Sequence, residues 1–265
     1  MKKVKGVSHI HSTYSYDGRL TLRELKKFFL KRGFQFLLLT EHIEKLDRKK
    51  IDSLIKECTN LSDENFVFVP GIEIDKYKLI ILGIRKAIEF RSPEEFIEKI
   101  IKQRPLFVLA HPILIKKEIP EKYSNLVEGC EIWNLKYDSP IIPRTSSLNL
   151  IKKLNMTKKV FGILGLDFHE REDFHDASIN MAIKNFTAKE IVKKIKAGKF
   201  MLKKKNLPVE IRTDFKFLKT SDLFRSTILS LIFDVSFKIH EILHKDNIPV
   251  PENIKLKLKG LIYGK

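Results

Sequence analysis

The chain has 265 residues, 43% of them hydrophobic, which is enough for one large barrel-type domain with a modest appendage. It has no run of 18 apolar residues and no apolar segment after its basic first residues, so we expect neither a membrane span nor a secretory signal. Cys58 and Cys130 are the only cysteines, which predicts a cytoplasmic location without a disulfide framework.

The net charge is strongly positive. Lysine and arginine number 51 against 33 acidic residues, a balance of +18. Such a charge favours polyanionic partners, and nucleic acid is the obvious one. Because the lysines are spread along the chain, a general compositional bias explains the charge equally well. The net charge alone therefore does not identify a binding partner.

The first predicted strand covers residues 3–8 and leads into His9 and His11. Two histidines at i and i+2 of an extended chain lie on the same side, and neutral imidazoles suit zinc, manganese or iron. Asp17 follows in a turn that Gly18 closes, and it adds an oxygen ligand. Taken alone, this pattern also fits an ordinary polar strand end.

A capping box from Thr21 to Glu24 opens a predicted helix that ends at Arg32, before Gly33. Strands and helices then alternate, which predicts a parallel α/β fold. The predicted strands are 34–39, 66–69, 79–84, 106–110, 129–134, 160–165 and 178–183. Helices are predicted within 43–64, from Ser92, near 145–156 and from Thr187, and an amphipathic segment runs over 221–244.

Residues suited to binding metal sit at or just after the ends of several predicted strands. In a barrel of parallel strands these ends meet at one face, where active sites are built. We therefore expect one shared metal site. Its candidate ligands are His9, His11, Asp17, His42, Glu73, His111, Asp167 and His169.

The motifs around these residues resemble those of the PHP family (polymerase and histidinol phosphatase). They are H-x-H-S-x-x-S-x-D-G at 9–18, T-E-H at 40–42, G-I-E-I at 71–74, A-H-P at 110–112 and G-x-D-x-H at 165–169. The resemblance covers residues 3–205. It implies a distorted TIM-like (β/α)7 barrel over residues 1–205. We expect residues 206–265 to form a helical extension packed on it.

The resemblance also implies two or three divalent metal ions, zinc, manganese or iron, and hydrolysis of phosphoesters. One ion would be held by His9, His11 and Asp167, and Glu73 would bridge it to a second ion at His111. The third would be held by Asp17, His42 and His169. Asp167 is the candidate catalytic base, and the candidate phosphate-binding residues are Arg19, Arg144 and His175.

One position departs from the family pattern. Family members often carry a histidine shortly after the bridging glutamate, in an H-x-x-G segment. In this chain Ile80 takes that place, three residues before Gly83. The second metal position is therefore in doubt.

The predicted function is metal-dependent hydrolysis of small phosphate esters or nucleotides. The alternatives are a nuclease that acts on nucleic-acid ends and a non-catalytic nucleic-acid-binding component. The sequence from His240 to His244 matches the H-E-x-x-H signature of zinc proteases, but only Asp246 and Glu252 follow as carboxylate ligands. We therefore do not favour a protease. The identity of the substrate and the oligomeric state stay open.

Overall fold

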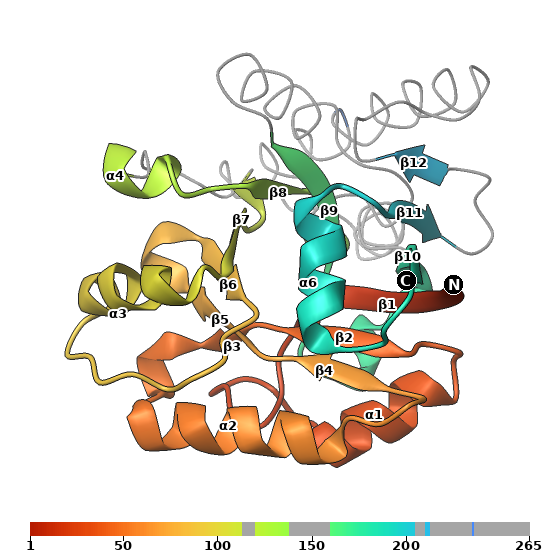
Figure 1. Cartoon of the computed structure of the whole chain (residues 1–265), viewed down its shortest axis with the longest axis horizontal. Coiled ribbons are helices and arrows are strands. Elements are labelled where there is room, and N and C mark those ends of the chain that lie inside the picture. Colours follow the sequence, from red (N-terminus) through yellow and green to blue (C-terminus); the bar gives the residue numbers. More distant parts are fainter. Residues whose placement is uncertain (113–119, 138–159, 205–209, 213–234, 236–265) are drawn as a thin grey trace, which may run out of the picture.

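The computed structural model describes residues 1–112, 120–137, 160–204, 210–212 and 235. It is a mixed α/β fold with one large sheet and few helices (Figure 1). Its strands are β1 Lys2–Ile10, β2 Phe36–Leu39, β3 Glu41–His42, β4 Val67–Val69, β5 Gly71–Ile74, β6 Leu79–Leu82, β7 Leu106–Leu109, β8 Gly129–Asn134, β9 Phe161–Phe168, β10 Ala177–Ile183, β11 Met201–Lys204 and β12 Glu210–Arg212. Its α-helices are α1 Leu22–Leu30, α2 Arg48–Leu61, α3 Pro93–Ile100, α4 Glu121–Ser124 and α6 Ala188–Lys196.

Strand β1 lies at the centre of the pairing. It runs parallel to β2 on one side and to β9 on the other, and its first half pairs antiparallel with β10. From β9 the sheet continues through β8, β7, β6 and β5 to β3, while β2 pairs with β4. Strand β2 passes almost directly into β3, and β4 into β5, so each of these two segments contributes two short strands.

The sheet is not all parallel, and the expectation of a parallel architecture was wrong on this point. Strand β6 runs antiparallel to both β5 and β7, and β10 and β11 are antiparallel to their neighbours. The reason lies in the connections. Only residues 75–78 join β5 to β6, which is too short for a crossover between parallel strands.

The helices begin and end at the predicted signals. Thr21 caps α1, and its side chain and that of Glu24 form the reciprocal capping box. Gly33 adopts a φ of 76° just after the helix, a conformation that glycine reaches without steric cost. In Figure 1, α1 and α2 lie along the side of β2 and β4, and α6 packs against β4 and β10.

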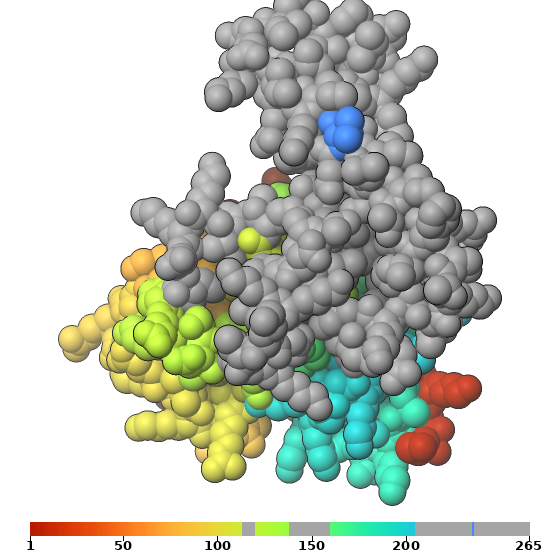
Figure 2. Space-filling view, turned by 90° about the horizontal axis from the view of Figure 1, so that it is seen from above, coloured from red at the N-terminus to blue at the C-terminus, as the bar shows by residue number. Residues whose placement is uncertain are grey.

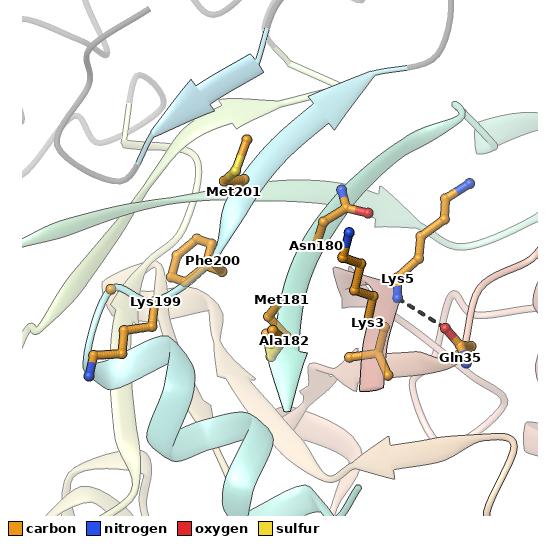
Figure 3. Close-up of a pocket in the computed structure, with 11 residues that line it drawn as sticks. Lys3, Lys5, Gln35, Asn180, Met181, Ala182, Lys199, Phe200 and Met201 are labelled. Carbon is orange, nitrogen blue, oxygen red and sulfur yellow. Dashed lines mark hydrogen bonds between the residues drawn. The ribbon is translucent and has the colours of Figure 1, made fainter. Parts of the chain in front are cut away.

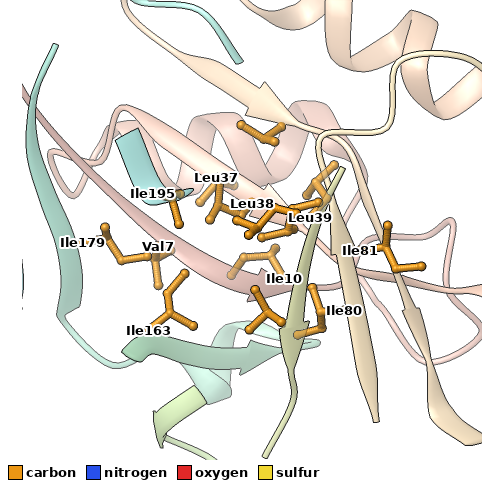
Figure 4. Close-up of a cluster of buried hydrophobic side chains, with 14 of the residues drawn as sticks. Val7, Ile10, Leu37, Leu38, Leu39, Ile80, Ile81, Ile163, Ile179 and Ile195 are labelled. Carbon is orange, nitrogen blue, oxygen red and sulfur yellow. The ribbon is translucent and has the colours of Figure 1, made fainter. Parts of the chain in front are cut away.

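The hydrophobic core lies where the strands converge. Val7 and Ile10 of β1 are fully buried, as is every residue of β2 (Figure 4). Ile80, Ile163, Ile179 and Ile195 come from four other elements and belong to the same cluster in that view. Because β1 crosses this core, packing on the surrounding strands fixes the position of its last residues, where the polar motif begins.

A hollow of about 740 Å³ lies at the opposite end of β1 from His9. Lys3, Lys5 and Lys199 line it, with Asn180 and the apolar side chains of Phe200 and Met201 (Figure 3). In the space-filling view the first residues of the chain lie beside the segment that contains β10, at one edge of the molecule (Figure 2).

Several predicted features fall outside the described residues. These are the helix near 145–156, Arg144, the H-E-x-x-H segment and nearly all of the extension over 206–265. Within that extension β12 is described, and it pairs antiparallel with β11. The boundary at residue 205 therefore stays a prediction. No helix in the described part of the chain has both the length and the apolar character needed to cross a bilayer.

Candidate metal centre

His9 and His11 lie at the end of β1, and both are fully buried. The register of β1 shifts between Ser8 and Ile10 against both neighbours, so His9 sits in a β-bulge. Its φ is 63°, in the left-handed region. A bulge re-aims the side chain that it carries, and the His9 ring here lies 5.2 Å from the His11 ring, centre to centre.

Glu73 is at the centre of the site. Its Oε2 atom lies 3.0 Å from His9 Nε2, 3.5 Å from His11 Nε2 and 3.9 Å from His42 Nδ1. Its Oε1 atom lies 3.1 Å from His111 Nε2. The sequence predicted that Glu73 lies just beyond the end of the strand 66–69. In the structure it lies within a further strand, β5. One buried carboxylate therefore faces four imidazoles, two from the end of β1, one from β3 and one just after β7.

Asp17 lies close to a second group of histidines. Its Oδ2 atom lies 3.0 Å from His169 Nε2 and 3.3 Å from His42 Nε2. The His11 ring stacks against each of these two histidines, with centre-to-centre distances of 4.3 Å to His169 and 4.4 Å to His42. The two groups of candidate ligands thus share His11 and His42 and form one continuous cluster.

Asp167 joins the first group from within β9. Its Oδ1 atom is 3.7 Å from His9 Nε2, and its Oδ2 atom accepts a hydrogen bond from Asn134 Nδ2 at 3.2 Å. Like His9, Asp167 and His111 have positive φ angles, 56° and 23°. Three of the candidate ligands are therefore held in a backbone conformation that side chains other than glycine rarely adopt.

Burial and mutual charge set the protonation of the cluster. Burial alone would lower the pKa of His9, but Glu131, Asp167 and Glu73 raise it well above its ordinary value. Burial and the neighbouring charge of His9 hold the pKa of His11 well below the usual range. For Glu73, the opposing effect of burial is outweighed by His9, His111 and His11, which lower its pKa well below the usual range. The carboxylate is therefore ionised, as a metal ligand must be.

Two further buried carboxylates support the histidines, and the sequence reading did not assign them a role. Glu131 accepts a hydrogen bond from His9 Nδ1 at 2.7 Å. Glu41 accepts hydrogen bonds from the Ser12 and Ser15 hydroxyls, both at 2.6 Å, and Ser15 Oγ lies 3.2 Å from His11 Nδ1. The sequence did contain a signal for both residues, because an acidic side chain within an apolar strand is costly to bury unless it is paired.

The donor set fits divalent metal ions. His11, Asp17, His42 and His169 each place one donor atom within 4.8 Å of the others, and the same holds for His9, His111 and Asp167 and for His9, His11 and Glu73. Metal–ligand bonds of about 2.0–2.2 Å place neighbouring ligand atoms roughly 3.3 Å apart in a tetrahedral site, close to the distances above. Asp17 Oδ1 and His111 Nδ1 are also buried without a hydrogen-bond partner among the described residues. Mixed nitrogen and oxygen ligands suit zinc, manganese or iron.

The structure therefore brings all eight predicted ligands together, while their role as ligands stays a prediction. Of the candidate phosphate-binding residues, Arg19 is exposed next to the site, where its backbone N–H donates to His169 O at 2.8 Å. His175 lies just before β10 and belongs to none of the ligand groups found in the described residues. Lys136, which sequence reasoning passed over, has its Nζ atom 3.0 Å from His169 Nδ1.

Ile80 lies directly across from Glu73 in the β5–β6 pair. Residues opposite each other in such a pair point to the same face of the sheet. The side chain is buried and apolar, so position 80 faces the cluster without offering it a donor atom. The expectation that one metal position is weakened here stays a prediction.

Comparison with known proteins was made by sequence and by structure. No family model matches the chain. It is 26% identical over 137 residues to the DNA polymerase/3'-5' exonuclease PolX of Bacillus subtilis (strain 168), covering 42% of this chain and 24% of that protein. It is 27% identical over 112 residues to a probable histidinol-phosphatase of Thermotoga maritima, covering 38% of this chain and 48% of that protein. The chain thus spans about a quarter and about half of the lengths of these relatives.

A solved structure shares the fold. It is a two-domain protein from Bacteroides vulgatus that contains a predicted PHP-like metal-dependent phosphoesterase. The TM-score is 0.57 at 15% sequence identity, and the match covers 85% of this chain and 69% of that one. Together with the two relatives and the clustered motif residues, this likeness supports the resemblance to PHP-family phosphoesterases that the motifs predict.

Proposed function

We propose that the protein hydrolyses phosphoesters with two or three divalent metal ions held in this cluster. The observation that carries the proposal is the position of Glu73, whose two carboxylate oxygens face the imidazoles of His9, His11, His42 and His111 at 3.0–3.9 Å. A buried carboxylate of this kind is the natural bridge between two cations. The names of the relatives, an exonuclease and a probable phosphatase, support the same class of reaction.

The proposed ligands form three groups. His9, His11, Glu73 and Asp167 surround one position, Glu73 and His111 a second, and Asp17, His42 and His169 a third. Ions bound there would neutralise the charge of the phosphate oxygens and lower the pKa of a bound water molecule. Zinc, manganese and iron are the ions that suit these donors.

The chain's own residues would then position the substrate and move the proton. Asn134 holds Asp167 Oδ2, which leaves Oδ1 facing His9 at 3.7 Å and His169 at 3.5 Å. In this proposal Asp167 accepts the proton of the attacking water. The Lys136 ammonium, beside His169, would pair with the negative charge of the substrate phosphate. In this proposal Lys136 and Arg19 are the phosphate-binding cations, while Arg144 and His175 remain candidates.

Two exposed tyrosines flank the cluster. The Tyr16 ring stacks on His42 at 4.8 Å, and the Tyr137 ring packs edge-on against His111 at 5.2 Å. Trp133 is fully buried and cannot stack on a ligand. Aromatic rings at a phosphate site are suited to stacking on a nucleobase, so we propose nucleotides and other small phosphate esters as the substrate class.

We also propose that the strands close into the distorted barrel of the family. The support is that pairing runs from β1 through β2 and β4 on one side and through β9, β8, β7, β6 and β5 on the other. Strand β5 directly follows β4 in the chain. The extension beyond residue 205 is proposed to pack on this barrel.

The first prediction tests the activity. Purified protein should hydrolyse p-nitrophenyl phosphate or a mononucleotide, and a chelator should remove this activity. Added Mn²⁺ or Zn²⁺ should restore it, because divalent ions of this kind suit the mixed imidazole and carboxylate donors of the cluster. Rates and bound metal per protein should be measured on the same samples. Full activity in metal-free protein would refute the proposal, and inactivity with metal loaded would favour a non-catalytic binding role.

A nuclease is the second candidate, and the basic hollow at the far end of β1 favours it. Lys3 and Lys199 are exposed there, and Lys5 Nζ forms an ion pair with Asp176 Oδ1 at 2.8 Å. His9 lies six steps along the strand from Lys3, a distance of roughly 20 Å at about 3.3 Å per residue. A mononucleotide cannot reach from the cluster to this hollow, whereas a polynucleotide of several residues can.

The second prediction compares two double variants with the same change of charge. Lys3→Glu with Lys199→Glu should weaken binding of a short single-stranded DNA and make it less sensitive to salt, because phosphate contacts carry the salt dependence. The control is Lys49→Glu with Lys102→Glu, at exposed positions away from the hollow. Equal losses in both variants, measured by fluorescence anisotropy at two salt concentrations, would mean that only the overall charge matters.

A further inference from the structure

Glu131 is a charged side chain in an unusual place. It lies in β8 between Cys130 and Ile132, and its exposed fraction is 0%. An ionised carboxylate is costly to bury unless it is paired and hydrogen-bonded. It is not among the ligands predicted from the sequence.

Each oxygen of Glu131 has a partner in the metal cluster. Oε1 accepts a hydrogen bond from His9 Nδ1 at 2.7 Å. Oε2 accepts one from the backbone N–H of His111 at 2.8 Å and one from Asn134 Nδ2 at 3.0 Å. The same Asn134 amide donates to Asp167 Oδ2 at 3.2 Å. One carboxylate therefore connects His9, His111 and Asp167, the three residues that form one of the candidate ligand groups.

The hydrogen bond to Nδ1 determines which atom of His9 is available. With Nδ1 protonated and directed at Glu131, only Nε2 of His9 can bind a metal ion, and Nε2 is the atom that faces Glu73 and Asp167. A carboxylate behind a metal-bound histidine fixes the tautomer and the orientation of the ring, and it makes the ligand more basic. Glu131 stands in this position relative to His9.

The backbone around Glu131 leaves room for it. A Cβ atom built on Gly165 of the neighbouring strand β9 would lie 1.9 Å from Glu131 Oε1. Glycine at 165 is therefore required if the carboxylate is to reach His9. The segment that carries Asp167 is thus shaped around the Glu131 side chain, which is not expected of an acid that only fills space.

We propose that Glu131 is the positioning residue of the metal centre, which fixes the Nε2 atom of His9 as a ligand and aligns His111 and Asp167 with it. The inference rests on the proposed function, since it assumes that His9 binds a divalent ion. Glu131 itself binds no ion in this account. It acts only through the three residues that it holds.

The third prediction concerns metal affinity rather than catalysis. In Glu131→Gln, an amide of the same shape loses the charge and cannot accept hydrogen bonds on both sides. The affinity of the tightest Zn²⁺ should fall about 10- to 100-fold in competition titrations with a chromophoric chelator. The matched control is Glu128→Gln, three residues earlier, where the side chain is partly exposed and pairs with Lys196 at 3.1 Å. Its affinity should equal that of the wild type.

A second measurement needs no variant. In zinc-loaded wild-type protein labelled with ¹⁵N-histidine, NMR should show His9 protonated at Nδ1 and metal-bound at Nε2. The opposite tautomer would overturn the proposal, as would unchanged Zn²⁺ affinity in Glu131→Gln. If the wild type binds Zn²⁺ and turns over phosphoesters in either case, only this inference fails. If the wild type binds no divalent ion, the proposed function fails with it.

Discussion

Glu73→Gln should lose phosphoesterase activity and the ability to retain more than one metal ion. The variant keeps the shape of the side chain but removes the negative charge that faces four imidazoles. Its amide nitrogen cannot ligate a cation, so the bridge between two positions is lost. Removing a partner outside the ligand shell costs up to about 100-fold in affinity or activity, and we expect the loss of the bridging residue to exceed that.

The measurement is the turnover of p-nitrophenyl phosphate together with metal content by elemental analysis. Glu94→Gln is a suitable control, because Glu94 lies at the start of α3, where it pairs with Lys76 at 2.6 Å and has no part in the cluster. The control should keep both activity and metal. A Glu73→Gln protein with wild-type turnover would rule out the proposed centre, whatever its metal content.

Gly18→Ala should destabilise the protein and disturb the Asp17 group. A Cβ atom at position 18 would lie 2.1 Å from the backbone oxygen of Ser12 and 2.6 Å from its carbonyl carbon. Ser12 cannot easily move, since its backbone N–H and hydroxyl both donate to Glu41. Steric overlap of this kind costs on the order of 3 kcal/mol of unfolding free energy. It would also shift Asp17, so the affinity for metal at His42 and His169 should fall.

Gly33→Ala provides the comparison. Gly33 has a φ of 76°, but nothing lies within 4 Å of a Cβ atom built there. The expected cost is about 1 kcal/mol from the left-handed backbone alone, with no effect on metal binding. Urea unfolding of the metal-free proteins and metal titration of the folded ones separate the two effects. Equal stability of the two variants would show that the loop from Ser12 to Gly18 is not packed as described.

Much of the fold could be read from local signals in the sequence. The Thr21 capping box, Gly33 and the apolar runs before His42 and His111 all lie where the elements begin or end. Strand direction could not be read in this way, because an apolar run looks the same in a parallel and an antiparallel pair. For β6 the missing clue was the length of the connection, since Asp75 to Lys78 can only turn the chain back.

In the site, too, some features could be predicted from the local sequence and others could not. Seven of the eight candidate ligands are metal-binding types of residue at or just after an apolar run, and Asp17 follows in the turn after His11. Glu131 and Asn134 were not predicted as site residues, although both lie in a segment that was predicted as a strand. Their importance depends on which atoms of other strands they reach, namely His9 Nδ1 and Asp167 Oδ2, and no spacing along the chain encodes that distance.

The left-handed backbone at His9, His111 and Asp167 lowers the stability of the fold at residues that the proposed activity requires. Each such residue costs on the order of 1–3 kcal/mol, and whole domains are stable by only about 5–15 kcal/mol. Glycine at these three positions would relax the chain but leave nothing to bind a cation. A bound ion stabilises the folded state that holds it and so offsets the strain. The end of the molecule that we propose does the chemistry is therefore also the end whose native geometry depends most on its ligand.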